Sequence, residues 1–420
     1  MNNNERLPAV KAMEVDAEIE CRIDDNAYGG DGIARVDGMV VFVKGAFKGE
    51  TVKARIRQVK KRFAKAEFVE LIEPSAEIPR LPRYTQVPGM VYAPIPPECE
   101  LALKSAQLVN FLSKLDENCT IDEPVVCGNG LGYRNKVTYH VEGGRVGYRE
   151  EGSHNVADIE YDPLACDPIN AALADARRVA ISSSSPPRSK SRSHDSRSDD
   201  VLTIRHTDLD GVHYWRGPSP RDLVLHEETA GLVFEVPTDG FYQVNPSVGE
   251  KLVEAVRKAY LEKPGDLLDL YCGVGVFGIA CLKAAVGQIE RTSGSRFPRL
   301  VGVESGRGAI ACAKRNAAAA GIAANFFCER VGASLGRMRV SPGHTIVVDP
   351  PRGGLEPNVA QWLAKCGAAR ILYVSCDPAT LTRDLEGMRA GYRISRVRLF
   401  QMFPRTARFE TLVQLERKGV

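Results

Sequence analysis

Three apolar runs in the second half of the chain each end in residues that could do chemistry. They are residues 267–271 before Cys272-Gly273-Val274-Gly275, 346–348 before Asp349-Pro350-Pro351-Arg352, and 371–374 before Ser375-Cys376-Asp377-Pro378. Short β-type runs that end in turns place such residues at the carboxyl ends of strands, where ligands bind in open α/β sheets. Among these groups, a thiol is the kind that can act as a nucleophile, and we take Cys376 as the candidate. The pattern predicts a site at one sheet edge that contains a reactive thiol.

The elements that must position these residues predict an α/β fold. From about residue 236 onward, strand-like and helix-like segments alternate, which indicates βαβ units and a largely parallel sheet. Residues 273–278 match GxGxxG between a strand and a helix, and the next strand-like run ends in Glu304, placed to bind ribose hydroxyls. Both features suit any cofactor that carries adenosine. A dehydrogenase has no need for Asp349-Pro350-Pro351-Arg352 and a thiol at consecutive strand ends, so we favour a methyltransferase.

The amino-terminal segment combines a barrel pattern with dense positive charge. Residues 14–73 alternate short β-type runs with glycine-rich turns, which is typical of a small five-stranded barrel. Between residues 44 and 65, nine cations accompany Glu50 alone: Lys44, Lys48, Lys53, Arg55, Arg57, Lys60, Lys61, Arg62 and Lys65. A basic barrel face can follow a phosphate backbone, so we predict that the first eight bind RNA. A solvated lysine-rich surface is the alternative.

The middle of the chain predicts a second, smaller domain. Residues 76–100 are rich in proline, 101–115 have helical spacing, and 125–161 resemble antiparallel strands. The low-complexity insertion 182–200 has almost no apolar residues, so we expect a mobile loop. We therefore divide the chain into a barrel (1–75), a central RNA-binding domain (76–235) and a catalytic domain (236–420).

Composition sets the outer limits. The chain has 420 residues, of which 44% are hydrophobic, and no apolar run approaches the roughly 20 residues of a membrane span. Its start is polar and lacks the apolar core of a secretory signal. The 11 cysteines include no CxxC pair, which is typical of reduced thiols in a cytosol. We expect a cytoplasmic protein, monomeric by default, without a membrane partner.

Five motifs, in order along the chain, carry a resemblance to a known family. They are Phe241-Tyr242-Gln243-Val244-Asn245, Asp269-Leu270-Tyr271-Cys272-Gly273, Asp349-Pro350-Pro351-Arg352, Ser375-Cys376-Asp377-Pro378 and Pro404-Arg405-Thr406-Ala407-Arg408-Phe409-Glu410. The series resembles the RNA uracil-5-methyltransferases. Residues 14–73 resemble the TRAM barrel of that family, an OB-type RNA-binding fold, and Tyr133-Arg134-Asn135-Lys136 resembles a motif of its central domain. The resemblance implies a class I, Rossmann-like methyltransferase domain, a small α+β central domain and S-adenosylmethionine as cofactor.

The family's chemistry assigns roles to residues of this chain. Carbon 5 of uracil is a weak nucleophile, and a thiolate added at carbon 6 turns the ring into an enolate that attacks a sulfonium methyl. A base must then remove the proton from carbon 5. The resemblance implies Cys376 as nucleophile and Glu410 as base. It places the cofactor at Gln243, Tyr271, Gly273, Gly275, Glu304 and Asp349, and the target uracil, flipped out or single-stranded, at Gln243 and Asp349.

The chain departs from the family pattern at several positions. Many relatives have Asn at the position of Val276, and His at those of Arg405 and Arg408. Some relatives with a TRAM barrel hold an iron–sulfur cluster on four cysteines. Three of those positions are taken here by Leu81, Val87 and Met90, which leaves only Cys166, and Cys99 does not replace the missing ligands. We predict neither an iron–sulfur cluster nor another metal.

Several alternatives stay open. The TRAM-like barrel favours 23S rRNA as substrate, and tRNA is the alternative. A methyltransferase acting on cytosine carbon 5 would also use a cysteine, although within different motifs, and an amino-methylating enzyme would need no thiol. A non-catalytic RNA-binding or assembly factor is a further alternative, disfavoured by the pair Cys376 and Glu410. Arg352 could bind a phosphate or hold the Asp349 loop.

Overall fold

The computed structural model describes residues 13–117, 119–150, 153, 155–182, 200–292 and 297–419. The predicted mobile loop at 182–200 therefore falls almost wholly outside the described residues. By their contacts the residues form two compact units. One contains residues up to Gln107 together with Arg405–Ala407, and the other contains Leu108–Pro404 and Arg408–Val420. The division into three domains stays a prediction.

The first unit contains the expected barrel. Its sheet has six strands in the order β1-β5-β6-β4-β3-β2, one more than predicted, because the two-residue β2 adds to the edge. The bounds are β1 (Glu18–Arg22), β2 (Asp25–Asn26), β3 (Gly32–Val36), β4 (Met39–Lys44), β5 (Thr51–Val59) and β6 (Phe63–Glu73). Alternate residues point inward: Val41, Val43, Ala64 and Ala66 are at most 3% exposed. This period-two alternation is why the segment forms strands around one small core.

The helix that follows the barrel contains a buried ionic cluster. α1 (Pro97–Leu112) lies close to the predicted helix 101–115, with proline at its first turn. The ammonium of Lys104 lies 2.8 Å from Glu100 Oε1, and Arg405 Nη1 lies 3.2 Å from Glu100 Oε2. The Arg405 guanidinium also donates to the carbonyls of Ala93 and Ile95. One carboxylate therefore neutralises two buried cations.

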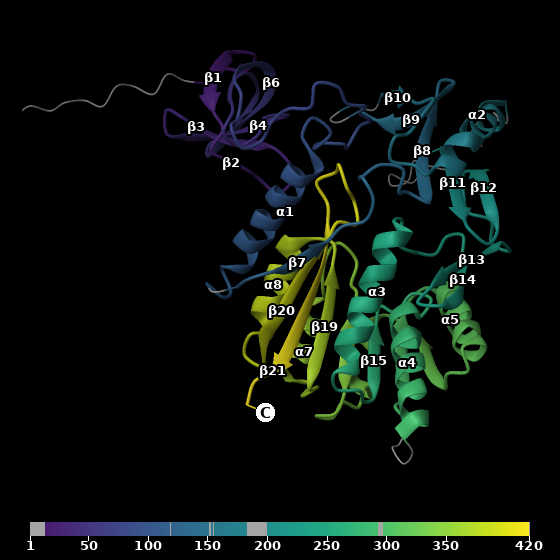
Figure 1. Cartoon of the computed structure of the whole chain (residues 1–420). Helices are drawn as coiled ribbons and strands as arrows, with labels where there is room; N and C mark the ends of the chain where they lie inside the picture. The colour runs from purple at the N-terminus through teal and green to yellow at the C-terminus, as the bar shows by residue number, and fades with distance from the viewer. Residues whose placement is uncertain are drawn as a thin grey trace, which may run out of the picture. The chain divides into compact units, whose positions relative to one another are not determined.

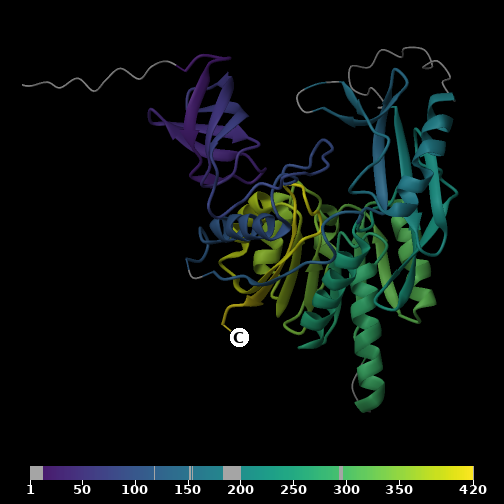
Figure 2. The same cartoon turned by 45° about the horizontal axis from the view of Figure 1, so that its top comes forward.

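An antiparallel sheet and one helix follow in the second unit. The sheet has the order β10-β9-β8-β11-β12, and Figures 1 and 2 show α2 (Asp167–Ser182) lying along it. Its strands are β8 (Lys136–Glu142), β9 (Arg145–Arg149), β10 (Val156–Asp158), β11 (Val201–Thr207) and β12 (Gly211–Arg216). The antiparallel strands predicted within 125–161 are confirmed. β7 (Asp122–Val125), by contrast, pairs with β20 of another sheet.

The largest sheet has eight strands in the order β17-β16-β15-β18-β19-β21-β20-β7. Their bounds are β15 (Leu267–Leu270), β16 (Leu300–Glu304), β17 (Ala324–Cys328), β18 (Thr345–Val348), β19 (Arg370–Ser375), β20 (Tyr392–Phe400) and β21 (Glu410–Arg417), besides β7. The first five in this order are parallel, and β21 runs antiparallel between β19 and β20. The predicted parallel α/β sheet is confirmed. Among the described residues, no helix is long and apolar enough to cross a membrane.

Helices cover both faces of this sheet (Figure 1). They are α3 (Pro246–Leu261), α4 (Val276–Thr292), α5 (Arg307–Ala319), α6 (Val331–Ser334), α7 (Pro357–Lys365) and α8 (Pro378–Met388); a short 3₁₀ turn spans Leu335–Arg337, and β13 (Val224–Thr229) pairs with β14 (Leu232–Pro237). The chain runs outward from β15 to β16 and β17, then returns to β18 on the other side of β15. In such sheets the point where the strand order reverses opens a crevice for ligands. Here that point lies between β15 and β18.

Candidate active site

The strand order brings the predicted residues of three separate motifs to one edge. Tyr271 follows β15, Asp349 follows β18, and the Asp349 amide donates to the carbonyl of Leu270 at 3.3 Å. Glu304 ends β16, whose Val303 pairs with Leu270. Cys376 follows β19, the neighbour of β18. Cofactor-side and nucleophile-side residues therefore lie along one sheet edge.

Cys376 and Glu410 meet because β21 runs antiparallel to β19. Ser375 is paired with Thr411. Continuing this register by one residue places Cys376 opposite Glu410, and directly opposed residues have Cβ atoms roughly 5 Å apart. Glu410 is 4% exposed, and its Oε2 has no hydrogen-bond partner among the described residues. A buried carboxyl with a free oxygen beside a thiol can exchange a proton with a molecule bound between them.

The electrostatics of this edge favour the protonated forms of its acids. Burial raises the pKa of Cys376 to about 12, and the nearby carboxyl groups of Glu410 and Asp349 act in the same direction. Burial also raises the pKa of Glu410 well above its usual value and that of Asp349 to about 7. The Arg352 guanidinium opposes the rise at both Cys376 and Glu410. A cation that binds here stabilises the anionic forms of all three groups.

A second arginine connects the loop of Cys376 to the strand of Glu410. Asp377 caps α8, because its Oδ1 accepts hydrogen bonds from the amides of Ala379 and Thr380 at 3.0 and 3.1 Å. Its Oδ2 accepts from Arg408 Nη1 at 2.9 Å. Arg408 precedes Glu410 by two residues, and Asp377 directly follows Cys376. The position at which relatives have histidine therefore carries an ion pair here.

Two roles were considered for Arg352: binding a phosphate and holding the Asp349 loop. The contacts of Arg352 favour the first. Its carbonyl accepts from the Thr380 hydroxyl at 3.4 Å, so the loop is held through backbone. The exposed guanidinium makes neither an ion pair nor a hydrogen bond with any described residue. An exposed guanidinium close enough to influence Cys376 and Glu410 suits a phosphate.

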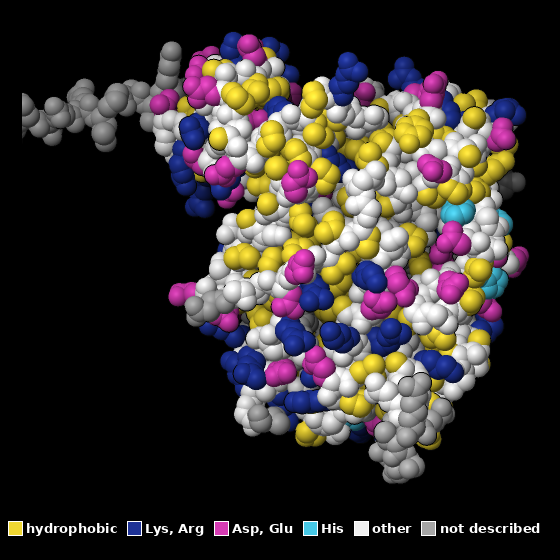
Figure 3. Space-filling view, viewed as in Figure 1, with side chains coloured by type: hydrophobic (Ala, Val, Ile, Leu, Met, Phe, Trp, Pro, Cys, Tyr) yellow, Lys and Arg dark blue, Asp and Glu magenta, His cyan; other side chains and the backbone are white. Residues whose placement is uncertain are grey.

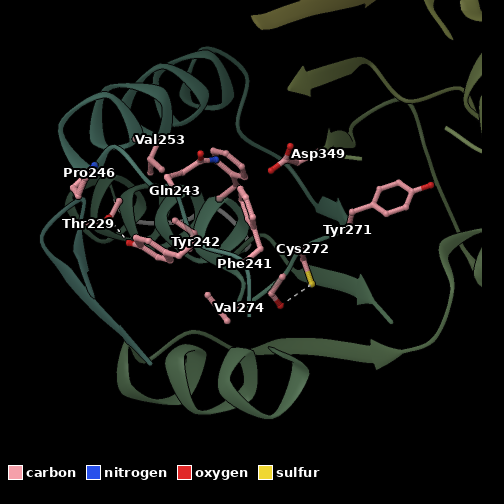
Figure 4. A pocket seen from close by; sticks show the side chains of 14 residues that line it. Thr229, Phe241, Tyr242, Gln243, Pro246, Val253, Tyr271, Cys272, Val274 and Asp349 are labelled. Carbon is pink, nitrogen blue, oxygen red and sulfur yellow. Dashed lines mark hydrogen bonds between the residues drawn. The ribbon is translucent and has the colours of Figure 1, made fainter. Parts of the chain in front are cut away.

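A pocket lies at the reversal point, lined by the glycine-rich loop after β15, by the segment before α3 and by Asp349. Figure 4 shows Gln243, Phe241 and Asp349 around it. Gln243 Oε1 is buried without a hydrogen-bond partner among the described residues, which suits a polar ligand. Phe241 is 67% exposed although it lines the pocket. The sequence placed Phe241 within a motif but did not predict that it lines the pocket.

The glycine-rich loop has the geometry that its sequence predicts. Gly273 and Gly275 have φ of 54° and 87°, in the region that side chains disfavour. A Cβ on Gly278 would lie 2.7 Å from Leu300 Cδ1 and 2.8 Å from Asp269 Oδ2, so the third glycine allows α4 to pack against the sheet. Val276 lines the pocket with an apolar side chain.

Glu304 and Tyr271, both predicted to bind the cofactor, differ in how their side chains are oriented. Glu304 Oε1 accepts from the amide of Gly306 at 2.7 Å, which orients the carboxylate at the end of β16. Tyr271 lines the pocket with φ of 61°, but its ring extends away from Tyr242 and Val253 in Figure 4. Its hydroxyl is buried without a partner among the described residues. The Glu304 carboxylate is thus fixed by its own loop at the end of β16, whereas the Tyr271 ring points away from those two pocket residues.

The Tyr133-Arg134-Asn135-Lys136 motif supports the site from the central sheet. The amide of Asn135 donates to the carbonyl of Val244 at 3.0 Å, next to Gln243. The Tyr133 hydroxyl donates to the carbonyl of Pro404 at 3.2 Å. Two of the five motifs are therefore connected through this one, a role that sequence reasoning did not assign.

The predicted RNA-binding cations of the barrel fall into two groups. Lys53 pairs with Glu70, Arg55 with Glu18, and Arg57 with Asp16 and Glu67. Lys48, Lys60, Lys61 and Arg62 are exposed, and their side chains make no ion pair with described residues. Lys44 is exposed as well. The eight cations are therefore not equivalent as phosphate ligands.

The positions that bind iron in some relatives cannot do so here. Val87 and Met90 are buried, at 7% and 1% exposure, and Leu81 is also apolar. No group of three or more His, Cys, Asp or Glu suited to a metal occurs among the described residues. The absence of a cluster stays a prediction.

Fold and site together define a class of enzyme. A doubly wound sheet, a glycine-rich loop at the reversal point and an acidic residue ending the next strand form the class I methyltransferase fold. The family described as tRNA (Uracil-5-)-methyltransferase matches residues 222–418, and the TRAM domain matches residues 14–69. The chain belongs to this family of RNA uracil-5-methyltransferases. Its catalytic domain has the fold of S-adenosylmethionine-dependent methyltransferases.

Relatives match along nearly the whole chain. An uncharacterized RNA methyltransferase of Streptomyces coelicolor is 32% identical, over 96% of this chain and 93% of that protein. The 23S rRNA (uracil(1939)-C(5))-methyltransferase RlmD of Aeromonas salmonicida is 28% identical, over 95% and 96%. The crystal structure of Pyrococcus abyssi tRNA (uracil-54, C5)-methyltransferase with S-adenosyl-L-homocysteine covers 94% of this chain and 100% of its own, with a TM-score of 0.71 and 21% identity. This last likeness shows the fold.

Proposed function

We propose that this enzyme methylates carbon 5 of one uridine in 23S rRNA through a covalent adduct with Cys376. The feature that supports the covalent route is the antiparallel register of β19 and β21, which, continued by one residue beyond Ser375 and Thr411, sets Cys376 opposite Glu410. A thiol and a carboxyl on the same edge can act on the two carbons of one double bond, the thiol as nucleophile at one carbon and the carboxylate as base at the other. Carbon 6 of uracil lies over the thiol and carbon 5 lies nearer the carboxyl.

The residues act in a fixed order. The Cys376 sulfur forms a bond to carbon 6, and the electron pair of the double bond moves into the ring as an enolate. Bound S-adenosylmethionine supplies the methyl group that carbon 5 attacks and a positive charge that lowers the pKa values of Cys376 and Glu410. Glu410 then takes the proton from carbon 5, and the Cys376 sulfur leaves carbon 6 as the double bond forms again.

The other residues bind and orient. Gln243 presents a buried amide to the uracil edge, which offers one donor and two acceptors. Asp349, with its pKa near 7, can donate or accept there. Phe241 provides an aromatic face, and Arg352 binds the phosphate of the flipped nucleotide. Glu304 binds the ribose of the cofactor.

The choice of 23S rRNA rests on full-length similarity to RlmD of Aeromonas salmonicida together with the TRAM barrel. A tRNA substrate is the second candidate, because the Pyrococcus abyssi tRNA enzyme matches the same length of chain. Mass spectrometric mapping of 5-methyluridine in rRNA and tRNA from a strain that lacks the gene separates them. One position lost from 23S rRNA supports the proposal, and a loss confined to tRNA contradicts it.

The covalent route is tested with RNA that contains 5-fluorouracil. Glu410 cannot remove fluorine from carbon 5, so the adduct should persist as a band of slow mobility on a denaturing gel. Cys376→Ala should give neither adduct nor methyl transfer, whereas Cys366→Ala, a thiol in the loop after α7, should behave as the parent. Glu410→Gln should accumulate the methylated adduct with normal RNA. Methyl transfer by Cys376→Ala would refute the covalent mechanism.

A further inference from the structure

The outward face of three barrel strands carries aromatic and basic side chains. Val41, Val43, Ala34, Ala64 and Ala66 point into the barrel core. The residues between them on β3, β4 and β6 therefore point outward. We call these six residues the aromatic–basic face: Ile33, Arg35, Val40, Phe42, Phe63 and Lys65.

Strand register places these side chains in two adjacent rows. Phe42 is paired with Ile33 on one side and with Lys65 on the other. Val40 is paired in the same way with Arg35 and Phe63. Each row thus has an apolar centre with a cation at one end, and the two cations lie at opposite ends.

The two phenylalanines form a pair outside the barrel core. Their ring centroids are 5.7 Å apart and the rings are inclined by 79°, an edge-to-face arrangement. Both are half-buried, and neither belongs to the hydrophobic residues packed against the core. In this arrangement one ring leaves its flat face uncovered by the other, and such a face can stack on a planar base.

Positive charge predominates in the two segments that contribute most of this face. The segments 33–44 and 60–65 contain six cations (Arg35, Lys44, Lys60, Lys61, Arg62 and Lys65) and one carboxylate, Asp37. In the part of the chain that the structure describes, the side chains of Arg35, Lys61, Arg62 and Lys65 have no ion-pair partner. On β5, by contrast, Lys53, Arg55 and Arg57 are neutralised by carboxylates. In Figure 3, Lys and Arg side chains gather at the left margin of the barrel.

We propose that the aromatic–basic face is the RNA-binding surface of the barrel, where an unpaired base stacks on Phe42 and Phe63. The flanking cations Arg35, Lys61, Arg62 and Lys65 bind the phosphates on either side of that base. The ion-paired cations of β5 do not contribute. The proposal rests on the RNA substrate proposed above, and it predicts a preference for single-stranded over duplex RNA.

Binding of a labelled oligouridylate to the full-length protein tests the stacking. Phe42→Leu with Phe63→Leu should weaken binding roughly tenfold and leave its salt dependence unchanged, because stacking releases no counterions. Val69→Ala, at an exposed apolar position in the other half of β6, is the matched control and should bind as the parent does. Parental affinity in the double variant, or equal affinity of the parent for an RNA duplex, would overturn the proposal.

The salt dependence tests the cations. Arg35→Gln with Lys65→Gln should reduce the slope of log Kd against log salt by roughly 0.7 for each cation removed. Lys53→Gln with Arg55→Gln removes the same charge from the ion-paired face and should leave the slope unchanged. An equal change in both double variants would contradict the assignment. Thermal unfolding of each variant verifies that the barrel is folded.

Methyl transfer to RNA, measured separately, distinguishes this proposal from the proposed function. A protein that binds oligouridylate through the aromatic–basic face but transfers no methyl group refutes the function and supports the face. A protein that methylates RNA while the phenylalanine variants bind normally supports the function and refutes the face.

Discussion

At the scale of single residues, the two carboxylate oxygens of Asp377 make different kinds of contact. One carboxylate oxygen caps α8 and the other binds Arg408, so the residue after Cys376 is connected to the segment before Glu410. The Arg408 side chain also compensates the charge of Asp377, which would otherwise raise the pKa of Cys376 further. Arg408 is thus a positioning residue that also affects the thiol through charge.

Replacing Arg408 should therefore change the pH dependence of the reaction. In Arg408→Met the charge of Asp377 is no longer offset by Arg408, so we expect the pKa of Cys376 to rise and less thiolate to form at neutral pH. We expect kcat to fall severalfold at pH 7 and to recover at higher pH, with a smaller change in KM. Arg408→Lys retains the charge and should restore much of the parental profile. A loss of kcat that is equal at every pH would contradict the electrostatic role.

Most of the site residues could be predicted from sequence, but their arrangement could not. The motifs around Cys376 and Glu410 were recognised by residue type and order. That the two face each other depends on β21 inserting antiparallel beside β19, and pairing between distant strands leaves no local pattern. For Val276 and Arg408 the sequence showed only that they differ from the family pattern. Their contacts, with the pocket and with Asp377, involve other elements and could not be predicted. That Phe241 lines the pocket was not predicted, because the sequence does not show whether an aromatic side chain is buried or exposed.

At the scale of elements, α4 approaches the sheet closely at one glycine. Gly278 also donates its amide to Asp269 Oδ2 at 3.0 Å, which connects the helix to β15 below the glycine-rich loop. The position of this helix sets the position of Gly273 and Gly275. Cofactor binding should therefore depend on a residue that does not line the pocket.

Two alanine substitutions in α4 should have opposite effects. Gly278→Ala introduces a methyl group where Leu300 and Asp269 leave no space, which should cost about 1–3 kcal/mol of stability. It should also weaken the binding of S-adenosylhomocysteine, measured by calorimetry. Gly287→Ala meets nothing within 4 Å and should stabilise the helix by up to about 1 kcal/mol without affecting binding. Similar effects of the two would show that the close packing at Gly278 is unimportant.

Other elements show why tertiary structure limits prediction. Helix and strand types were predicted correctly for α1, which has leucines at helical spacing, and for the parallel strands, which are short apolar runs that end in turns. β7 was not expected in the large sheet, because its parallel partner β20 is about 270 residues further along the chain. The two-residue β2 is too short to leave a periodic signal.

At the scale of the whole molecule, the three members of the buried cluster of Glu100, Lys104 and Arg405 are not equivalent, because the one carboxylate contacts both cations. Burial lowers the pKa of Lys104 to about 8, against the attraction of Glu100. If the charge of Lys104 is removed by substitution, Glu100 remains paired with Arg405. Loss of the Glu100 charge, by contrast, removes a carboxylate that both buried cations contact.

Unfolding in urea at pH 7.5 should reveal this asymmetry. Glu100→Gln should lose about 3–5 kcal/mol of stability, whereas Lys104→Met should be close to neutral or stabilising. Because the folded-state pKa of Lys104 lies below its unfolded value, its contribution becomes more favourable as the pH rises from about 8 towards 10. The parent should therefore gain stability relative to Lys104→Met over that range. Equal losses in the two variants would contradict the assignment of Glu100 as the shared partner.

Arg405–Ala407 belong to the first unit by their contacts, although the chain on both sides of them belongs to the second. A fragment that starts after Gln107 would keep Cys376 and Glu410 yet leave the Arg405 guanidinium without Glu100, Ala93 and Ile95. The catalytic half is therefore not a transferable module. We therefore expect gene fusions, truncations and domain exchanges that cut the chain once near Gln107 to yield an inactive protein.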